Sequence, residues 1–325
     1  MKQILAVLLL LSLVSCANVP ATGVPAVVTL TTVAAETMPF PTLVPSVTPS
    51  RTPTIPLTPE PSCDPFRVDF CVTEGHFILQ RPIQPPGNAL VDPYYRYGST
   101  ADGTRDPHHG VEFPNASGTP VYAAADGTVV FAGNDEQAAD AAYAPWGNFY
   151  GNLVVIEHPD GLFTLYAHLS RIDVQAGQNV AVGQKIGEVG RTGGAIGSHL
   201  HFEVRQGDVE DYFATQNPEL WLVPAIDSNG SSFGVLQISV KGEDGQLRKN
   251  ANFTIGHYLD RSQLPDEIHY ATSYSSDLLN GSENTALSEL SAGLYRIVVE
   301  TNGQMLERWV EVESGKLTQV VFVVK

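Results

Sequence analysis

The middle of the chain alternates between short apolar runs and turns that contain glycine and aspartate. Asp126-Gly127 separates the runs 121–123 and 128–131, and a second Asp-Gly turn separates the runs 153–156 and 163–168. An Asp-Gly pair between β-branched or aromatic runs is a strong signal for a hairpin of two strands. Because this part of the chain has little helical patterning, we predict a mainly β, antiparallel domain.

A second block of alternating apolar positions occupies residues 225–325. Leu236, Ile238 and Val240 alternate with polar residues, and Asn302-Gly303 is a turn dipeptide between Val-rich runs. This pattern predicts a separate antiparallel β-sandwich. Its histidines are not clustered with other polar residues, so we expect a supporting or binding role rather than chemistry.

The N-terminus has the pattern of an export signal. Lys2 precedes an apolar run over residues 4–14, and the run ends in Leu13-Val14-Ser15-Cys16. The run is too short to span a bilayer permanently. Its last four residues resemble the bacterial lipobox, which implies removal of residues 1–15 and a lipid on Cys16. The alternative is an ordinary signal peptide with a chance cysteine; the lipoprotein interpretation predicts an extracytoplasmic protein anchored to a bacterial membrane.

The segment that follows Cys16 is rich in Pro, Thr, Val, Ala and Ser. Residues 16–62 have almost no charge and no helical or strand period, so we predict a lipidated cysteine followed by an extended tether. At about 3.1 Å per residue, such a tether reaches on the order of 100 Å.

Two cysteines, Cys63 and Cys71, remain in the chain after the tether. In an oxidising compartment a closely spaced pair usually forms a disulfide. A metal site is a poorer interpretation, since two thiols do not complete a tetrahedral shell. We therefore predict a disulfide between Cys63 and Cys71.

Length and charge limit the possible classes of protein. The chain has 325 residues, with 35 acidic against 18 basic side chains and a formal charge of -17. This length accommodates two domains, which we place at residues 63–224 and 225–325. An acidic chain without a basic stripe repels polyphosphate, so we expect no nucleic-acid partner.

Histidines are concentrated in three segments of the first domain. His199 and His201 are two positions apart in an apolar run, so in a strand they point to the same face. Two neutral imidazoles side by side are natural zinc ligands, or one ligand and one base. A catalytic zinc site typically has three protein ligands and a water molecule, so one pair is not enough.

The other two segments supply the remaining candidates. His108 and Glu112 form a second potential ligand pair, because zinc accepts both imidazole nitrogen and carboxylate oxygen. His168 shares a predicted strand face with Tyr166, which suits it to proton transfer near the metal. His109 points away from His108 if the segment is extended, so contact with substrate or metal is the minor alternative to a structural role.

These segments resemble, in order, the lysostaphin/LytM-type peptidoglycan endopeptidases. The resemblance covers roughly residues 90–220 and is carried by an H-x-G-x-[acid]-F motif and four further segments: 108–113, 118–127, 150–156, 166–169 and 199–203. It implies a compact antiparallel β fold, the duplicated hybrid motif, with a groove over one zinc ion. It also implies three metal ligands, His108, Glu112 and His201, and two catalytic histidines that are not ligands, His168 and His199.

One position departs from the family pattern. The middle ligand of the family is usually aspartate, whereas this chain has Glu112, which keeps the charge and adds a methylene group. The resemblance implies a zinc endopeptidase that hydrolyses peptide bonds in peptidoglycan. The alternatives are a non-catalytic module that binds the wall or activates a hydrolase, since some relatives have lost ligands, and a zinc peptidase that acts on free proteins.

Overall fold

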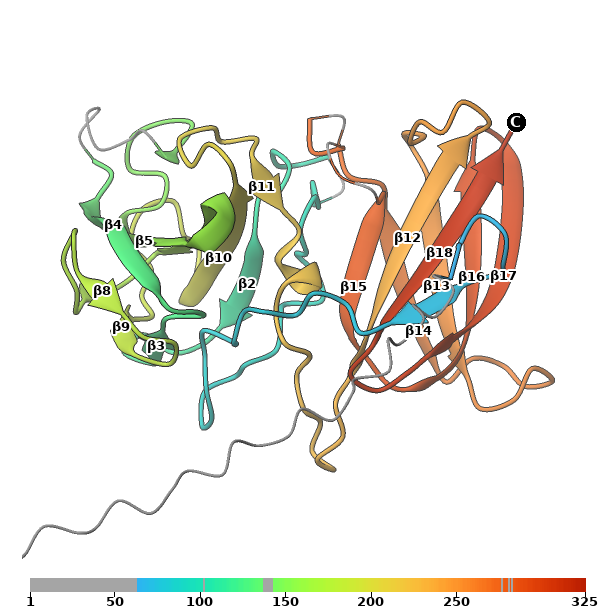
Figure 1. The fold of residues 1–325 in the computed structure, drawn as a ribbon, viewed down its shortest axis with the longest axis horizontal. Helices are drawn as coiled ribbons and strands as arrows, with labels where there is room; N and C mark the ends of the chain where they lie inside the picture. The colour runs from blue at the N-terminus through green and yellow to red at the C-terminus, as the bar shows by residue number, and fades with distance from the viewer. Residues whose placement is uncertain (1–62, 102, 137–142, 276, 280, 282) are drawn as a thin grey trace, which may run out of the picture. The chain divides into compact units, whose positions relative to one another are not determined.

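The computed structural model describes residues 63–325 apart from 102, 137–142, 276, 280 and 282 (Figure 1). The predicted signal peptide 1–15, Cys16 and the tether 16–62 lie outside the described residues. The prediction of a mainly β, antiparallel protein is confirmed, and the short 3₁₀ turns η2 (Pro159–Gly161) and η3 (Pro218–Leu220) connect strands. Within the described part of the chain, no helix has the length and apolar character needed to cross a membrane.

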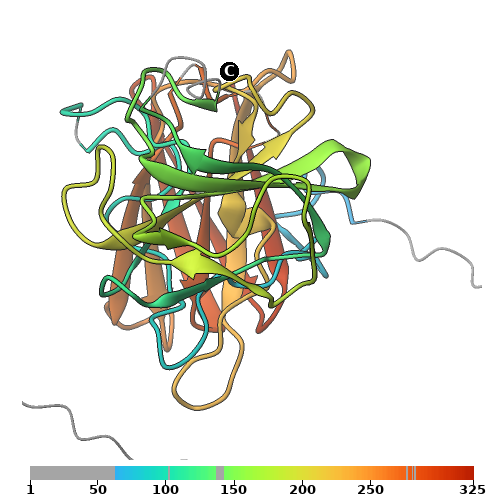
Figure 2. The same ribbon diagram turned by 90° about the vertical axis from the view of Figure 1, so that its left-hand side faces the viewer.

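The first half of the described chain contains two sheets, whose strands face the viewer in Figure 2. The larger sheet contains β2 (Val111–Pro114), β4 (Gly127–Asn134), β5 (Asn152–His158), β6 (Leu162–Ala167), β8 (Asn179–Val180), β10 (His199–Gln206) and β11 (Thr215–Gln216). The smaller sheet contains β3 (Pro120–Tyr122), β7 (Arg171–Ile172) and β9 (Lys185–Glu188). The larger sheet has the order β11-β10-β6-β5-β4-β8, and β2 also pairs with β10.

Only one of the two expected Asp-Gly hairpins in this half is present. Asp160-Gly161 joins β5 to β6, which pair in antiparallel fashion from His158 opposite Leu162. The hairpin expected at Asp126-Gly127 is wrong, because β3 pairs with β9 while β4 pairs with β5 and β8. Gly127 instead allows a close approach of strands, since a Cβ there would lie 2.4 Å from the carbonyl oxygen of Glu157.

Alternation along β10 separates the core from the candidate site. Leu200, Phe202 and Val204 are fully buried in the main hydrophobic cluster, together with apolar residues of β2, β5 and β6. The intervening residues of β10 therefore face the opposite side of the sheet. The apolar face holds β10 in place by burying its side chains from water, and this determines where its histidines point.

The C-terminal half is a two-sheet sandwich. Its strands are β1 (Cys71–Thr73), β12 (Gly234–Gly242), β13 (Asn252–Tyr258), β14 (Glu267–Thr272), β15 (Thr285–Leu290), β16 (Gly293–Thr301), β17 (Gln304–Val312) and β18 (Leu317–Val324). The sheets have the orders β1-β18-β12-β15 and β14-β13-β16-β17, and apolar residues from both form one core. Within these sheets β12 and β18 pair in parallel, because the chain enters β18 by crossing from the other sheet rather than through a hairpin.

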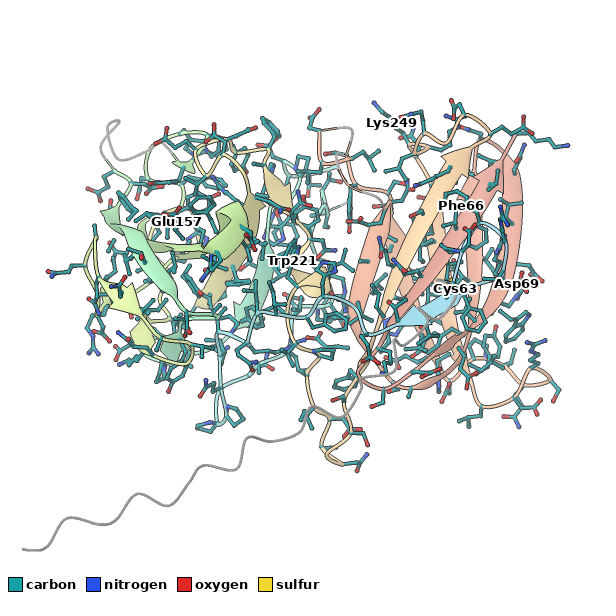
Figure 3. The ribbon with its side chains drawn as sticks, in the orientation of Figure 1. Cys63, Phe66, Asp69, Glu157, Trp221 and Lys249 are labelled. Carbon is teal, nitrogen blue, oxygen red and sulfur yellow. A yellow bond between two sulfur atoms is a disulfide. The ribbon has the colours of Figure 1, made fainter. Side chains whose placement is uncertain are left out.

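The segment that begins at Cys63 joins the C-terminal sandwich. Cys63 and Cys71 are bonded through their sulfur atoms, and β1 pairs with β18. Figure 3 labels Cys63, Phe66 and Asp69 in this segment, where Arg308 donates a hydrogen bond to the carbonyl oxygen of Asp69. Sequence alone assigned these residues to the first domain, since a strand of three residues carries no signal for its pairing with β18, far along the chain.

Candidate metal centre

Three adjacent strands bring the candidate residues together. In the ladder between β2 and β10, Glu112 lies directly opposite His201. In the ladder between β10 and β6, His201 lies opposite Ala167, the residue before His168. Glu112 and His201 are therefore neighbours on adjacent strands. On the other side of His201, the neighbouring residue is Ala167, which directly precedes His168.

The potential ligand atoms of His108, Glu112 and His201 form a small triangle. His108 Nε2 lies 2.9 Å from Glu112 Oε1 and 3.1 Å from His201 Nδ1, and the last two atoms are 3.1 Å apart. Donor atoms on a tetrahedral zinc ion are about 3.3 Å apart, because each bond is about 2.0 Å long. The triangle therefore fits a zinc ion with little rearrangement.

The charges at the triangle also favour a cation. Burial alone would raise the pKa of Glu112, but the positive charge of His201 and the close imidazole nitrogens of His108, His199 and His201 hold this pKa well below its usual range. Burial alone would lower the pKa of His201. The neighbouring carboxylates of Glu112 and Glu203 have the larger effect and raise this pKa to about 9. Oε2 of Glu112 is buried without a hydrogen-bond partner. A buried carboxylate with an unsatisfied oxygen is a suitable ligand for a divalent ion.

Glu203 holds the far side of the His201 ring, a role that sequence reasoning missed. His201 Nε2 lies 3.0 Å from Glu203 Oε1, so its N–H donates to the carboxylate and leaves Nδ1 free as a ligand. Arg205 donates to Glu203 Oε2 from Nε at 2.8 Å, and Tyr150 Oη donates to Oε1. Strand alternation alone places Glu203 on the same face as His201, so the sequence contained a signal for this contact.

His108 is held by the segment that precedes it. Its Nδ1 lies 3.3 Å from the carbonyl oxygen of Arg96, which leaves Nε2 for the triangle. The ring of Tyr95 stacks on the His108 ring with centroids 4.1 Å apart. Both the tautomer and the plane of this imidazole are therefore determined by residues 95–96.

His168 lies beside the triangle but not on the predicted strand face. β6 ends at Ala167, and His168 has a left-handed φ of 62°, while Tyr166 is fully buried in the core. The shared face with Tyr166 is therefore wrong, because the chain turns at His168. The His168 Nδ1 atom lies 2.9 Å from the carbonyl oxygen of Thr192, which leaves Nε2 as a proton acceptor. Burial lowers the pKa of His168 to about 3.

Two glycines permit this contact between His168 and Thr192. A Cβ on Gly151 would lie 2.4 Å from the backbone nitrogen of Gly193, and both glycines have positive φ. The backbones therefore approach more closely than any other residue type allows. The glycine-rich segment before β10 thus positions a catalytic candidate.

His199 lies on the open side of the same cluster. Its Nδ1 is 3.0 Å from the carbonyl oxygen of Gly197, and its Nε2 is 2.9 Å from Glu112 Oε2, although the two atoms do not form a hydrogen bond. The rings of His168 and His199 are 4.8 Å apart. The two histidines outside the ligand triangle are therefore neighbours beside it.

His109 has a structural environment. Its Nδ1 lies 2.8 Å from the carbonyl oxygen of Tyr212, and its ring stacks on the Tyr212 ring at 3.8 Å. Burial lowers the pKa of His109 to about 4, so this side chain is neutral at pH 7. It packs against the groove wall and is not a member of the ligand triangle.

A groove of about 690 Å³ opens over the triangle. Its rim contains exposed apolar side chains, including Tyr94, Trp146 and Ile196, and its lining includes Arg105 and Asp106. An open groove with apolar and charged walls above a set of metal ligands can hold an extended polar chain.

Comparison with known proteins identifies the segment that contains the candidate site. Residues 106–212 match the model of peptidase family M23. This segment is a peptidase family M23 domain. It contains all five residues of the candidate site: His108, Glu112, His168, His199 and His201.

Similar sequences include several bacterial proteins. The chain is 40% identical over 134 residues to the peptidoglycan DD-endopeptidase ShyA of Vibrio cholerae, covering 39% of this chain and 28% of that protein. It is 44% identical over 98 residues to the DD-carboxypeptidase/endopeptidase Mpg of Neisseria meningitidis, covering 30% of this chain and 20% of that protein. It is 37% identical over 123 residues to the uncharacterized lipoprotein YgeR of Escherichia coli, covering 38% of this chain and 41% of that protein. The chain therefore spans less than half the length of these relatives.

This part of the chain is also similar to solved structures. The catalytic domain of the antimicrobial peptidase lysostaphin from Staphylococcus simulans is 32% identical, with a TM-score of 0.31, covering 39% of this chain and 86% of that one.

Proposed function

We propose that this protein is a zinc-dependent endopeptidase that hydrolyses peptide bonds in bacterial peptidoglycan. The observation that carries the proposal is the triangle of His108, Glu112 and His201, with His168 and His199 beside it under an open groove. This is the complement of groups needed for metal-assisted hydrolysis. The relatives named for peptidoglycan endopeptidase activity support the choice of substrate.

The ligand triangle would hold one zinc ion. A zinc ion bound there supplies a Lewis acid that activates a water molecule and polarises the scissile carbonyl. His201 is oriented for this role by Glu203, and His108 by Tyr95 and the Arg96 carbonyl. Glu112 contributes the negative charge that offsets part of the ion's charge.

His168 is the candidate general base. Its Nδ1–H donates to backbone carbonyl oxygens, so Nε2 carries the lone pair and accepts a proton from the attacking water. A base held in one tautomer by fixed carbonyls needs no reorientation during the reaction. His199, on the open side, orients the water or stabilises the developing oxyanion.

The loss of a ligand would favour the non-catalytic alternative, a module that binds the wall or activates a hydrolase. Here each ligand position is filled, and the substitution of glutamate for the usual aspartate leaves the carboxylate oxygen within 3.1 Å of both histidine ligands. The complete donor set therefore favours catalysis over a purely wall-binding or activating role.

We further propose that residues 63–224 and 225–325 are separate domains, and that the protein acts outside the cytoplasm, anchored by a lipid on Cys16. The disulfide between Cys63 and Cys71 is typical of an exported protein. The similarity to a lipoprotein of Escherichia coli agrees with the lipid anchor. The substrate class also lies outside the cytoplasmic membrane.

The function is tested by mass analysis of peptides released from purified peptidoglycan. The expected result is new free amino groups and shortened cross-links with the zinc-loaded protein, and none after treatment with chelator. Restoration by added zinc controls for damage to the protein. Equal release in a preparation shown to be free of metal would contradict the proposal, whereas zinc binding without any release would support the non-catalytic alternative.

A further inference from the structure

The C-terminal sandwich sends two residues of β15 toward the first half of the chain. The ladder between β12 and β15 has an irregularity in which Val235 lies opposite both Ser288 and Glu289. Glu289 has a left-handed φ of 64°, which is rare for a residue with a side chain. A β-bulge redirects side chains away from the regular pleat, and such strain persists only where the surrounding structure holds it.

The redirected Glu289 side chain binds the segment that leads to the groove. Its Oε1 accepts hydrogen bonds from Arg81 Nη1 at 2.6 Å and from the backbone nitrogen of Val91 at 2.9 Å. The side chains of Glu289 and Arg81 are both about nine-tenths buried, with 8% and 9% exposed. A buried carboxylate with a charged partner holds that partner firmly, because separation would leave both charges desolvated.

Ser288 contributes a second connection through Glu219. The Glu219 side chain is fully buried, and its Oε2 accepts hydrogen bonds from the backbone nitrogen of Ser288 at 2.6 Å and from its hydroxyl at 2.7 Å. The same oxygen forms an ion pair with Arg96. β15 is therefore linked to residues 91 and 96, the two ends of a short segment.

That segment, residues 91–96, forms one wall of the groove, and we call it the tyrosine wall. Asp92, Tyr94 and Tyr95 line the groove, and Tyr95 stacks on His108. The backbone next to the wall also holds His108, whose nitrogen donates to the Ser99 carbonyl oxygen at 2.9 Å and whose carbonyl oxygen accepts from Gly98 at 2.7 Å.

We propose that the bulge at Ser288–Glu289 positions the tyrosine wall, and through it His108, so that the C-terminal sandwich is a working part of the groove. Ser288 and Glu289 are positioning residues, because they act on the site through Arg81, Val91 and Glu219. The effect on metal binding rests on the function proposed above; the effect on the order of the wall does not.

The test uses hydrogen exchange and zinc affinity of the full chain. Glu289→Leu removes the acceptor for Val91 and Arg81, and we expect exchange to accelerate at least 10-fold over residues 91–99 and at His108, with unchanged exchange in β5 and β6. Zinc affinity is expected to fall about 10-fold, the lower end for loss of groups that orient ligands. Glu289→Gln keeps an acceptor oxygen and is expected to restore both measurements nearly to wild type.

Glu307→Gln is the matched control. It breaks an ion pair with Arg296 in the other sheet of the same sandwich, and should leave exchange over residues 91–99 and zinc affinity unchanged. Ser288→Ala removes one hydrogen bond to Glu219 and is the milder variant if Glu289→Leu does not fold; it should accelerate exchange in the same residues by a smaller factor.

Two outcomes would overturn the proposal. In the first, the variants lower the denaturation midpoint but leave residues 91–99 exchanging as in wild type. In the second, exchange accelerates equally in β5 and β6, so that β15 stabilises the chain as a whole. Neither measurement needs peptidoglycan, so loss of the proposed enzymatic function would not affect the exchange result. Faster exchange with unchanged zinc affinity would retain the positioning of the wall and reject its extension to His108.

Discussion

Glu112 lies directly opposite His201 across the ladder between β2 and β10, with Oε1 and Nδ1 3.1 Å apart. The contact joins residues that are 89 positions apart in the chain. Pairing across one ladder makes the ligand pair a consequence of strand register, because a slip of one residue would move His201 to the core face.

The two histidines of β10 are expected to respond differently to mutation. His201→Ala removes a ligand, so zinc affinity should fall by more than 100-fold and hydrolysis should be lost. His199→Ala leaves the ligand triangle intact; zinc affinity should stay within about threefold, while turnover falls by about 10² to 10³, the usual loss when one group that stabilises the oxyanion is removed. Competition with a chromophoric chelator and peptide release measure the two effects. Equal loss of zinc in both variants would contradict the division of roles.

Glu203→Gln tests the support of His201. The amide keeps the size of the side chain but loses the negative charge that Arg205 and the His201 N–H require. We expect zinc affinity to fall 10- to 100-fold, as is typical for groups that orient metal-bound histidines. Glu157→Gln, at an exposed position of β5, is the control and should bind zinc as the wild type does. An unchanged zinc affinity in Glu203→Gln would show that Glu203 does not support zinc binding by His201.

Glu112→Asp tests whether the longer side chain suits this backbone. The carboxylate would retract by about 1.5 Å, the length of one carbon–carbon bond. Because Glu112 Oε1 already lies 2.9 Å from His108 Nε2, the shorter side chain should weaken zinc binding and lower turnover, each about 10-fold. Titration of zinc and peptide release measure both. Activity that appears only in Glu112→Asp would show that the native protein is a non-catalytic module.

His158 is expected to make stability depend on pH. Burial lowers the pKa of His158, and its nitrogens lie 2.8 Å from the Asp126 carbonyl oxygen and 2.8 Å from Thr164 Oγ1. Below about pH 6.5 the unfolded chain binds a proton that the folded chain resists, so the free energy of unfolding falls as pH falls, by at most about 1.4 kcal/mol per pH unit for this group.

Comparison with His158→Gln isolates this contribution. The variant loses the native hydrogen bonds and should be less stable than the wild type at pH 7.5, with a difference that narrows at pH 5. Urea unfolding at both pH values, at the same metal content, measures the difference. If the free energies of unfolding of the two proteins differ by the same amount at both pH values, His158 does not take up a proton on unfolding.

Strand alternation was enough to predict several features of the candidate site. His199 and His201 share a face because side chains alternate along a strand, and the apolar residues between them could only face the core. The same rule fails at His168, where a left-handed residue ends the strand. A local conformation of this kind depends on the neighbouring glycine backbones at 151 and 193, which periodicity does not report.

By itself, the sequence determined the mainly β character, the face of β10 that carries histidines, and the family of the M23 segment, since these depend on local alternation and on motif residues. Only the tertiary structure decided that β1 completes the C-terminal sheet and that Glu203 supports His201 from a buried pocket with Arg205. It alone also showed that Glu289 reaches Val91. These contacts join distant segments, and their strength comes from burial and from charges removed from water, which exist only once the chain has folded.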